Sequence, residues 1–147
     1  MRKFVFAGVW AVVCILAAVP VWSHFVMIIP SDSMVMQNDQ RTIHLDYSFS
    51  HPFEGIGMAL VQPKQVVVVK DGKTTDLKDK LSETKIMGHR GWQVKYPIKR
   101  PGAYIFCMEP KPYWEPVEDC FIIHYTKTVV AAFGDDEGWD AEVGLKT

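Results

Sequence analysis

The sequence has almost no surplus charge of either sign, with sixteen basic and seventeen acidic side chains and a formal net charge of −1 over 147 residues. A balanced chain offers no broad basic surface, so nucleic-acid binding is excluded, and contact with a membrane is expected only through a partner or an uncleaved leader. The residues also contain no catalytic carboxylate pair, glycine-rich phosphate loop or nucleophile elbow, and no CxxC or HExxH pattern. We therefore expect a protein that is not an enzyme.

Long helices are also missing after the first 23 residues, because proline and glycine interrupt the chain at short intervals. Short alternating segments take their place. Residues 41–49 alternate between apolar and polar side chains, residues 92–98 do so again, and Asp71-Gly72 supplies a tight hairpin turn between residues 66–69 and 74–77. Only residues 77–84 fit a helical turn. The pattern predicts an all-β fold, an antiparallel β-sandwich of the immunoglobulin-like kind.

The first 23 residues have the pattern of a secretory signal peptide. A cationic start precedes an uncharged apolar run over residues 4–19, Pro20 ends the run, and Val21 and Ser23 are small enough for a peptidase that cuts after Ser23. We predict an exported chain with a signal helix at residues 1–23 and one β-sandwich domain at residues 24–147. The alternative is an uncleaved anchor over residues 4–22, which is long enough to span a bilayer core of about 30 Å.

Cysteine is scarce, and Cys14 lies within the leader, so the mature domain keeps Cys107 and Cys120. An even pair in an exported protein favours a disulfide bond. We expect residues 103–108 and 121–125 to form a long-looped hairpin with the two thiols near its facing ends, where a bridge would stabilise the fold by about 3 kcal/mol. The alternative is a thiolate site for a soft ion such as Cu(I), formed by Cys107 with Met108.

Histidine supplies the remaining chemistry. Cleavage after Ser23 would leave His24 with a free α-amine and an imidazole on one residue, and the two groups can chelate a divalent transition metal together. His51 is the best further candidate, because it lies in an expected loop over residues 50–58 together with Glu54 and Met58.

The other histidines are weaker candidates. His124, on the expected strand over residues 121–125, fits either a core histidine or a ligand. His44 falls on the polar face of its strand, and His89 lies in a surface turn beside the cation of Arg90, which would repel a metal.

Three segments together resemble a known family: residues 24–31 (HFVMIIPS), residues 48–58 (SFSHPFEGIGM), and the stretch from MEPKPYWEP at 108–116 to HYTK at 124–127. The chain resembles an exported bacterial family of formally unknown function, often described as the periplasmic component of nickel or cobalt uptake systems. The resemblance implies a periplasmic β-sandwich that presents a divalent ion to an energy-coupling transporter in the inner membrane. His24 and His51 match histidines of the family. Members usually continue into a second β-rich region, so this chain is expected to be truncated after the first.

Three functions follow for testing. The leading hypothesis is a non-catalytic metal-binding accessory of a transporter, in which His24 and His51 bind nickel or cobalt and His124 or Glu54 completes the shell; copper and zinc suit the same donors. The second is a copper-loaded enzyme that uses the terminal chelate. The third is an interaction module without metal, in which Tyr113 and Trp114 form an exposed contact.

Overall fold

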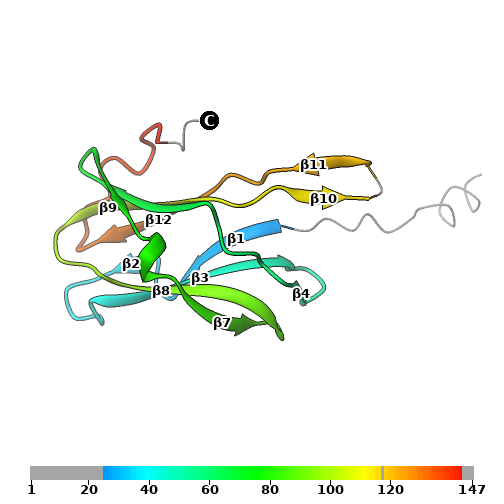
Figure 1. Ribbon diagram of the computed structural model, residues 1–147. Coiled ribbons are helices and arrows are strands. Elements are labelled where there is room, and N and C mark those ends of the chain that lie inside the picture. Colours follow the sequence, from blue (N-terminus) through cyan, green and yellow to red (C-terminus); the bar gives the residue numbers. More distant parts are fainter. Residues whose placement is uncertain (1–24, 117, 144–147) are drawn as a thin grey trace, which may run out of the picture.

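The structure is a computed structural model that describes residues 25–116 and 118–143 of the chain, so the predicted signal peptide lies outside the described residues. The described residues form twelve β-strands and one short 3-10 helix (Figure 1). In chain order these are β1 (Phe25–Pro30), β2 (Met34–Val35), β3 (Thr42–His51), β4 (Ile56–Met58), β5 (Gln65–Lys70), β6 (Lys73–Asp76), η1 (Lys78–Lys80), β7 (Ser82–Ile86), β8 (His89–Pro97), β9 (Gly102–Glu109), β10 (Tyr113–Glu115), β11 (Cys120–Ile122) and β12 (Thr126–Ala132).

The strands form two sheets that pack face to face. One sheet has the order β1-β3-β8-β7, with β4 also paired to β3, and the other has the order β2-β12-β9-β5-β6. Every pair within them is antiparallel except β2 with β12. Strands β10 and β11 form a separate hairpin, which Figure 1 shows at the same end of the sandwich as β4 and the beginning of β1. The predicted all-β sandwich is confirmed.

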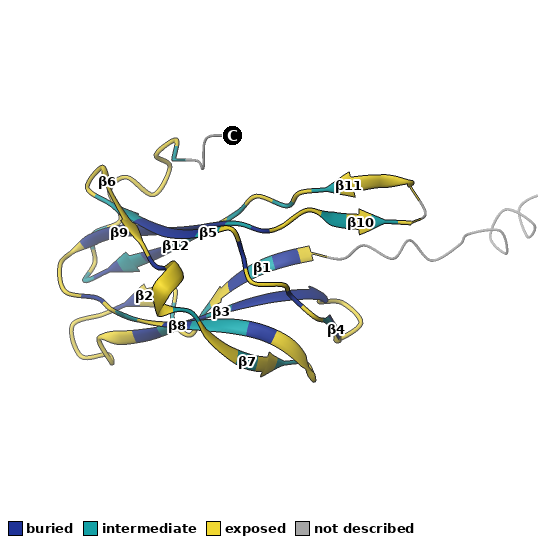
Figure 2. Ribbon diagram, in the orientation of Figure 1, coloured by how far each residue is buried: buried dark blue, intermediate teal, exposed yellow. Residues whose placement is uncertain are grey.

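The core lies between the two sheets and follows from alternation along the strands (Figure 2). On β3 the apolar side chains of the alternating segment are all buried, whereas Thr42 is exposed and His44 and Asp46 are half-buried. The buried four are Ile43, Leu45, Tyr47 and Phe49. Strand β9 contributes Tyr104, Phe106 and Met108 to the same cluster from the opposite sheet. Each fully buried large side chain of this kind contributes about 1.5–3 kcal/mol to the stability of the fold, so the packing of the two sheets against each other is the main source of stability.

Strand β9 is the central strand of its sheet, and it is buried on both faces. Its outward side chains Ile105 and Cys107 form a second cluster with Val67, and Val143 from the end of the described chain packs against that cluster. The continuous apolar run of β9 therefore reflects two-sided burial.

The hairpin predicted at Asp71-Gly72 is present between β5 and β6. The two turn residues have φ angles of 50° and 70°, the left-handed values that a type I′ turn requires at both positions.

The predicted disulfide between Cys107 and Cys120 is wrong, since both cysteines are free. The reason is the pairing of the strands. Strand β9 is flanked by β5 and β12, which places Val67 and Lys127 opposite Cys107, whereas Cys120 lies on the separate β10–β11 hairpin opposite Glu115. Cys107 is buried and Cys120 is exposed, so the two thiols have different surroundings.

Two segments also differ from the expected secondary structure. The helical turn predicted over residues 77–84 shrinks to η1, and β7 begins directly afterwards and pairs with β8. The strand predicted over residues 121–125 ends at Ile122, and the strand that pairs with β9 begins only at Thr126.

Within residues 25–116 and 118–143, no helix has the length and apolar character needed to cross a bilayer.

Candidate metal centre beside the start of β1

His51 is the last residue of β3, so the expectation that it lies in a loop is wrong. Strand β4 folds back on β3 and pairs Ile56 with His51, which extends the strand to that residue. His51 is only 6% exposed. Because side chains alternate along a strand, His51 lies on the same face as Phe49 two residues earlier, which is the face that meets the core.

Glu54 lies in the turn between β3 and β4, as predicted. Its Oε2 atom is 3.8 Å from Nδ1 of His51, and its backbone N–H donates to the carbonyl oxygen of His51 at 3.2 Å. The Glu54 side chain is 40% exposed, so this carboxylate connects the buried imidazole to solvent. Carboxylates beside a histidine ring orient the ring in many metal sites.

The ring of Phe49 links His51 to the segment that contains His124. The ring centroids of Phe49 and His124 are 6.4 Å apart, and the ring of Tyr113 meets Phe49 edge-on at 5.0 Å. His124 is half-buried and lies between β11 and β12, not on a strand. Phe49 is therefore near both histidines, one on its own strand and one in the segment between β11 and β12.

Thr126 ties this segment to β1. Its Oγ1 atom lies 2.9 Å from the carbonyl oxygen of Val26 and 3.1 Å from that of His124, so the hydroxyl can donate to either carbonyl. Val26 in turn lies opposite Phe49 in the β1–β3 pair. The beginning of β1 is thus held next to both histidine-bearing segments.

His24 lies outside the described residues. Within the described part of the chain, no group of three histidine, cysteine, aspartate or glutamate side chains is close enough to share one metal ion. His51, Glu54 and His124 therefore do not form a complete metal site by themselves, and a site at this end of the sandwich needs a further donor.

The other two described histidines, His44 and His89, have different surroundings. His44 is on the outer face of its sheet, where its Nδ1 donates to Oε1 of Gln93 at 3.3 Å, and Gln93 donates to Asp46 at 2.7 Å. His89 is exposed at the start of β8 beside Gly57 of β4, which pairs with Ser50, so it lies at the same end of the sandwich as His51.

Sequence reasoning missed Phe49 and Thr126 as the residues that bring the histidine segments together. Phe49 is the last apolar residue of the alternating segment 41–49, and that position was the available signal. Nothing in the local sequence marks Thr126, because its contact with Val26 spans a separation of 100 residues.

The fold and the site define a β-sandwich protein in which His51 ends the strand that carries Phe49, and His124 lies beside the ring of that phenylalanine. The chain belongs to the family described as Domain of unknown function (DUF4198), whose family model matches residues 21–147. No curated protein and no solved structure matches the chain.

Proposed function

We propose that the protein is an exported, non-catalytic accessory that binds a divalent transition metal, nickel or cobalt, and presents it to an inner-membrane uptake transporter. The observation that supports this most is the register of β1 and β3. Phe25 lies opposite Ser50, one residue before His51. His24 directly precedes Phe25 in the sequence, and consecutive α carbons are 3.8 Å apart.

A continuation of this antiparallel register by one residue would pair His24 with His51. Directly opposed residues project from the same face of a sheet, with Cβ atoms about 4.5–5.5 Å apart. Val26 and Ile28 point into the core, so alternation would give the side chain of His24 the same face as theirs. The proposed donors are the α-amine and ring of His24 and the ring of His51, with Glu54 or His124 as a further ligand.

Nitrogen donors of this kind suit nickel and cobalt, and they also suit copper and zinc. The free Cys107 does not compete for the ion, because it is buried in the outer cluster of the second sheet. Burial raises the pKa of its thiol, which disfavours the thiolate that binds a metal.

Calorimetric titration with nickel and cobalt tests the proposal on the protein whose first residue is His24. A matched protein with one alanine added before His24 keeps every side chain but blocks the six-membered chelate formed by the α-amine and ring of His24. We expect the extension to weaken binding by at least about tenfold, and His51→Gln to weaken it by about 10- to 100-fold. His44→Gln removes a histidine seven residues before His51 on β3, where it contacts Gln93, and serves as the control. Equal affinity with and without the extra alanine would rule out the terminal chelate.

An interaction module is the second candidate, and one observation favours it. The β10–β11 hairpin carries Trp114 and Phe121, whose rings meet edge-on at 4.9 Å while remaining 44% and 68% exposed. Exposed aromatic pairs of this kind are common anchors of protein interfaces. If none of the metals binds the processed protein, this function replaces metal delivery. A Trp114→Ser/Phe121→Ser variant should leave metal affinity unchanged if the proposed site is right.

A further inference from the structure

A second site lies at the opposite end of the sandwich from His51. It is an open pocket of about 280 Å³, lined by four cationic side chains and two aromatic rings: Lys70, Lys80, Lys99, Arg100, Tyr96 and Tyr104. No carboxylate is among its lining residues in the described part of the chain. Pro97, at this end, pairs with Thr42 at the start of β3, and a ten-residue strand spans about 30 Å, so the pocket is remote from the proposed metal site.

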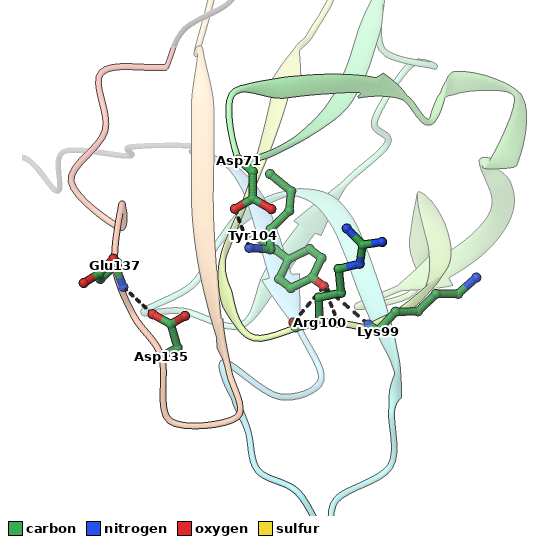
Figure 3. Close-up of polar contacts among 7 residues, drawn as sticks. Asp71, Lys99, Arg100, Tyr104, Asp135 and Glu137 are labelled. Atoms are coloured by element: carbon green, nitrogen blue, oxygen red, sulfur yellow. Dashed lines mark hydrogen bonds and ion pairs between the residues drawn. The ribbon is translucent and has the colours of Figure 1, made fainter.

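Tyr104 holds one wall of the pocket in place. Its hydroxyl donates to the carbonyl oxygen of Arg100 at 2.9 Å and accepts from the backbone N–H groups of Arg100 and Lys99 at 3.0 and 3.3 Å (Figure 3). The residue is only 4% exposed, so its ring is anchored in the core while its hydroxyl reaches the turn after β8. The turn that carries two of the four cations is therefore fixed by a buried side chain.

Lys70 is the one cation of the four with a carboxylate partner. Its Nζ lies 2.7 Å from Oδ1 of Asp71, and it also lies over the ring of Tyr104, 5.3 Å from the centroid. Among the described residues, no ion pair is formed by Lys80, Lys99 or Arg100. Three unneutralised cations around one hollow create a local positive potential, although the whole chain carries almost no net charge.

We infer that this pocket binds a compact ligand bearing carboxylate or phosphate groups. Arginine recognises both groups through paired N–H donors, and lysine adds a point charge. Tyr96, whose ring packs edge-on against Tyr104 at 6.0 Å, supplies an apolar wall beside these charges. The volume lies at the lower limit of ordinary small-ligand pockets, about 300 Å³, so a small polyanion fits better than a nucleotide or a peptide. None of the pocket residues is a proposed metal ligand, so the site does not depend on the metal proposal.

Calorimetric titration with citrate and with pyrophosphate, in metal-free buffer of low ionic strength, tests the inference and separates the two anion chemistries. In the protein with its native side chains, at least one of the two anions should bind. The variant Lys99→Gln/Arg100→Gln loses two exposed charges and should bind at least about tenfold more weakly, since hydrogen bonds to charged groups are the stronger kind. The matched control Lys85→Gln/Lys111→Gln removes two exposed charges outside the pocket and should change affinity by less than about twofold.

Tyr104→Phe separates binding in the pocket from general electrostatic attraction, because attraction alone would leave the anion affinity of this variant unchanged. It keeps all four cations but releases the turn, so we expect weaker binding than in the native protein. Circular dichroism establishes that each variant is folded. The inference is overturned if neither anion binds, if the control loses as much affinity as the pocket variant, or if a folded Tyr104→Phe protein binds as tightly as the native one.

Discussion

Two buried tyrosines differ sharply in their hydrogen bonding, and this difference predicts opposite effects of the same substitution. Tyr47 is fully buried in the core, and no described group lies within hydrogen-bonding distance of its hydroxyl. Burial raises the pKa of that hydroxyl, and the nearby thiol of Cys107 adds to the effect. Tyr104 is almost as buried, but its hydroxyl makes three hydrogen bonds to the turn at Lys99 and Arg100.

The magnitudes follow from these contacts. An unsatisfied buried hydroxyl costs about 1–3 kcal/mol, so Tyr47→Phe removes that penalty and loses only the packing of one oxygen atom. We expect Tyr47→Phe to be between neutral and about 1 kcal/mol more stable than the native protein. Tyr104→Phe loses hydrogen bonds worth about 1 kcal/mol each, part of which water at the open pocket restores, so it should be about 1–2 kcal/mol less stable.

Urea unfolding followed by circular dichroism measures both variants against the native protein. We expect the midpoint to rise or stay constant for Tyr47→Phe and to fall for Tyr104→Phe, with unchanged slopes. A clear loss of stability in Tyr47→Phe, equal to that in Tyr104→Phe, would refute it. Such a result would mean that the Tyr47 hydroxyl has a bonding partner.

Two further predictions concern the cysteines. In the folded protein a maleimide should label Cys120 more than about 100-fold faster than Cys107, because Cys107 becomes accessible only on unfolding, which typically costs 5 kcal/mol or more. Cys120→Ser should abolish the fast phase, and resistance of both thiols to labelling before reduction would instead indicate a disulfide. Because burial raises the pKa of the Cys107 thiol, the unfolded chain loses this proton first as the pH rises, and the free energy of unfolding should fall above about pH 8.5. The decline measured between pH 8.5 and 10 should be smaller in Cys107→Ala, and an equal decline in that variant would contradict the assignment.

The strands with strict alternation could be predicted from the sequence. Residues 42–49 of β3, residues 92–97 of β8 and the Asp71-Gly72 hairpin follow from local patterns, because one buried face and one turn chemistry determine them. The partners of β9 could not be predicted. Its apolar run gives no register, and the 16 residues between β9 and β12 contain their own hairpin, which moved Cys120 away from Cys107.

The candidate site could also be predicted only in part from the sequence. The sequence identified His51, Glu54 and His124 as donors, but it placed His51 in a loop, since the pairing of β4 with β3 leaves only a three-residue pattern. Contacts such as that of Phe49 with His124 join segments far apart in the chain, and no local pattern encodes them. The basic pocket escaped notice for a related reason, because its cations come from β5, η1 and the turn after β8, which only the fold brings together.

The central claim is that the mature chain begins at His24 and holds a metal ion beside His51. Native mass spectrometry of protein exported with its own leader, from cells supplied with nickel and cobalt, tests the cut and the metal together. We predict the mass of residues 24–147 plus one metal ion, and loss of that ion in the His51→Gln protein but not in His44→Gln. A chain that keeps residues 1–23, or a correctly cut chain that carries no metal, would contradict the claim.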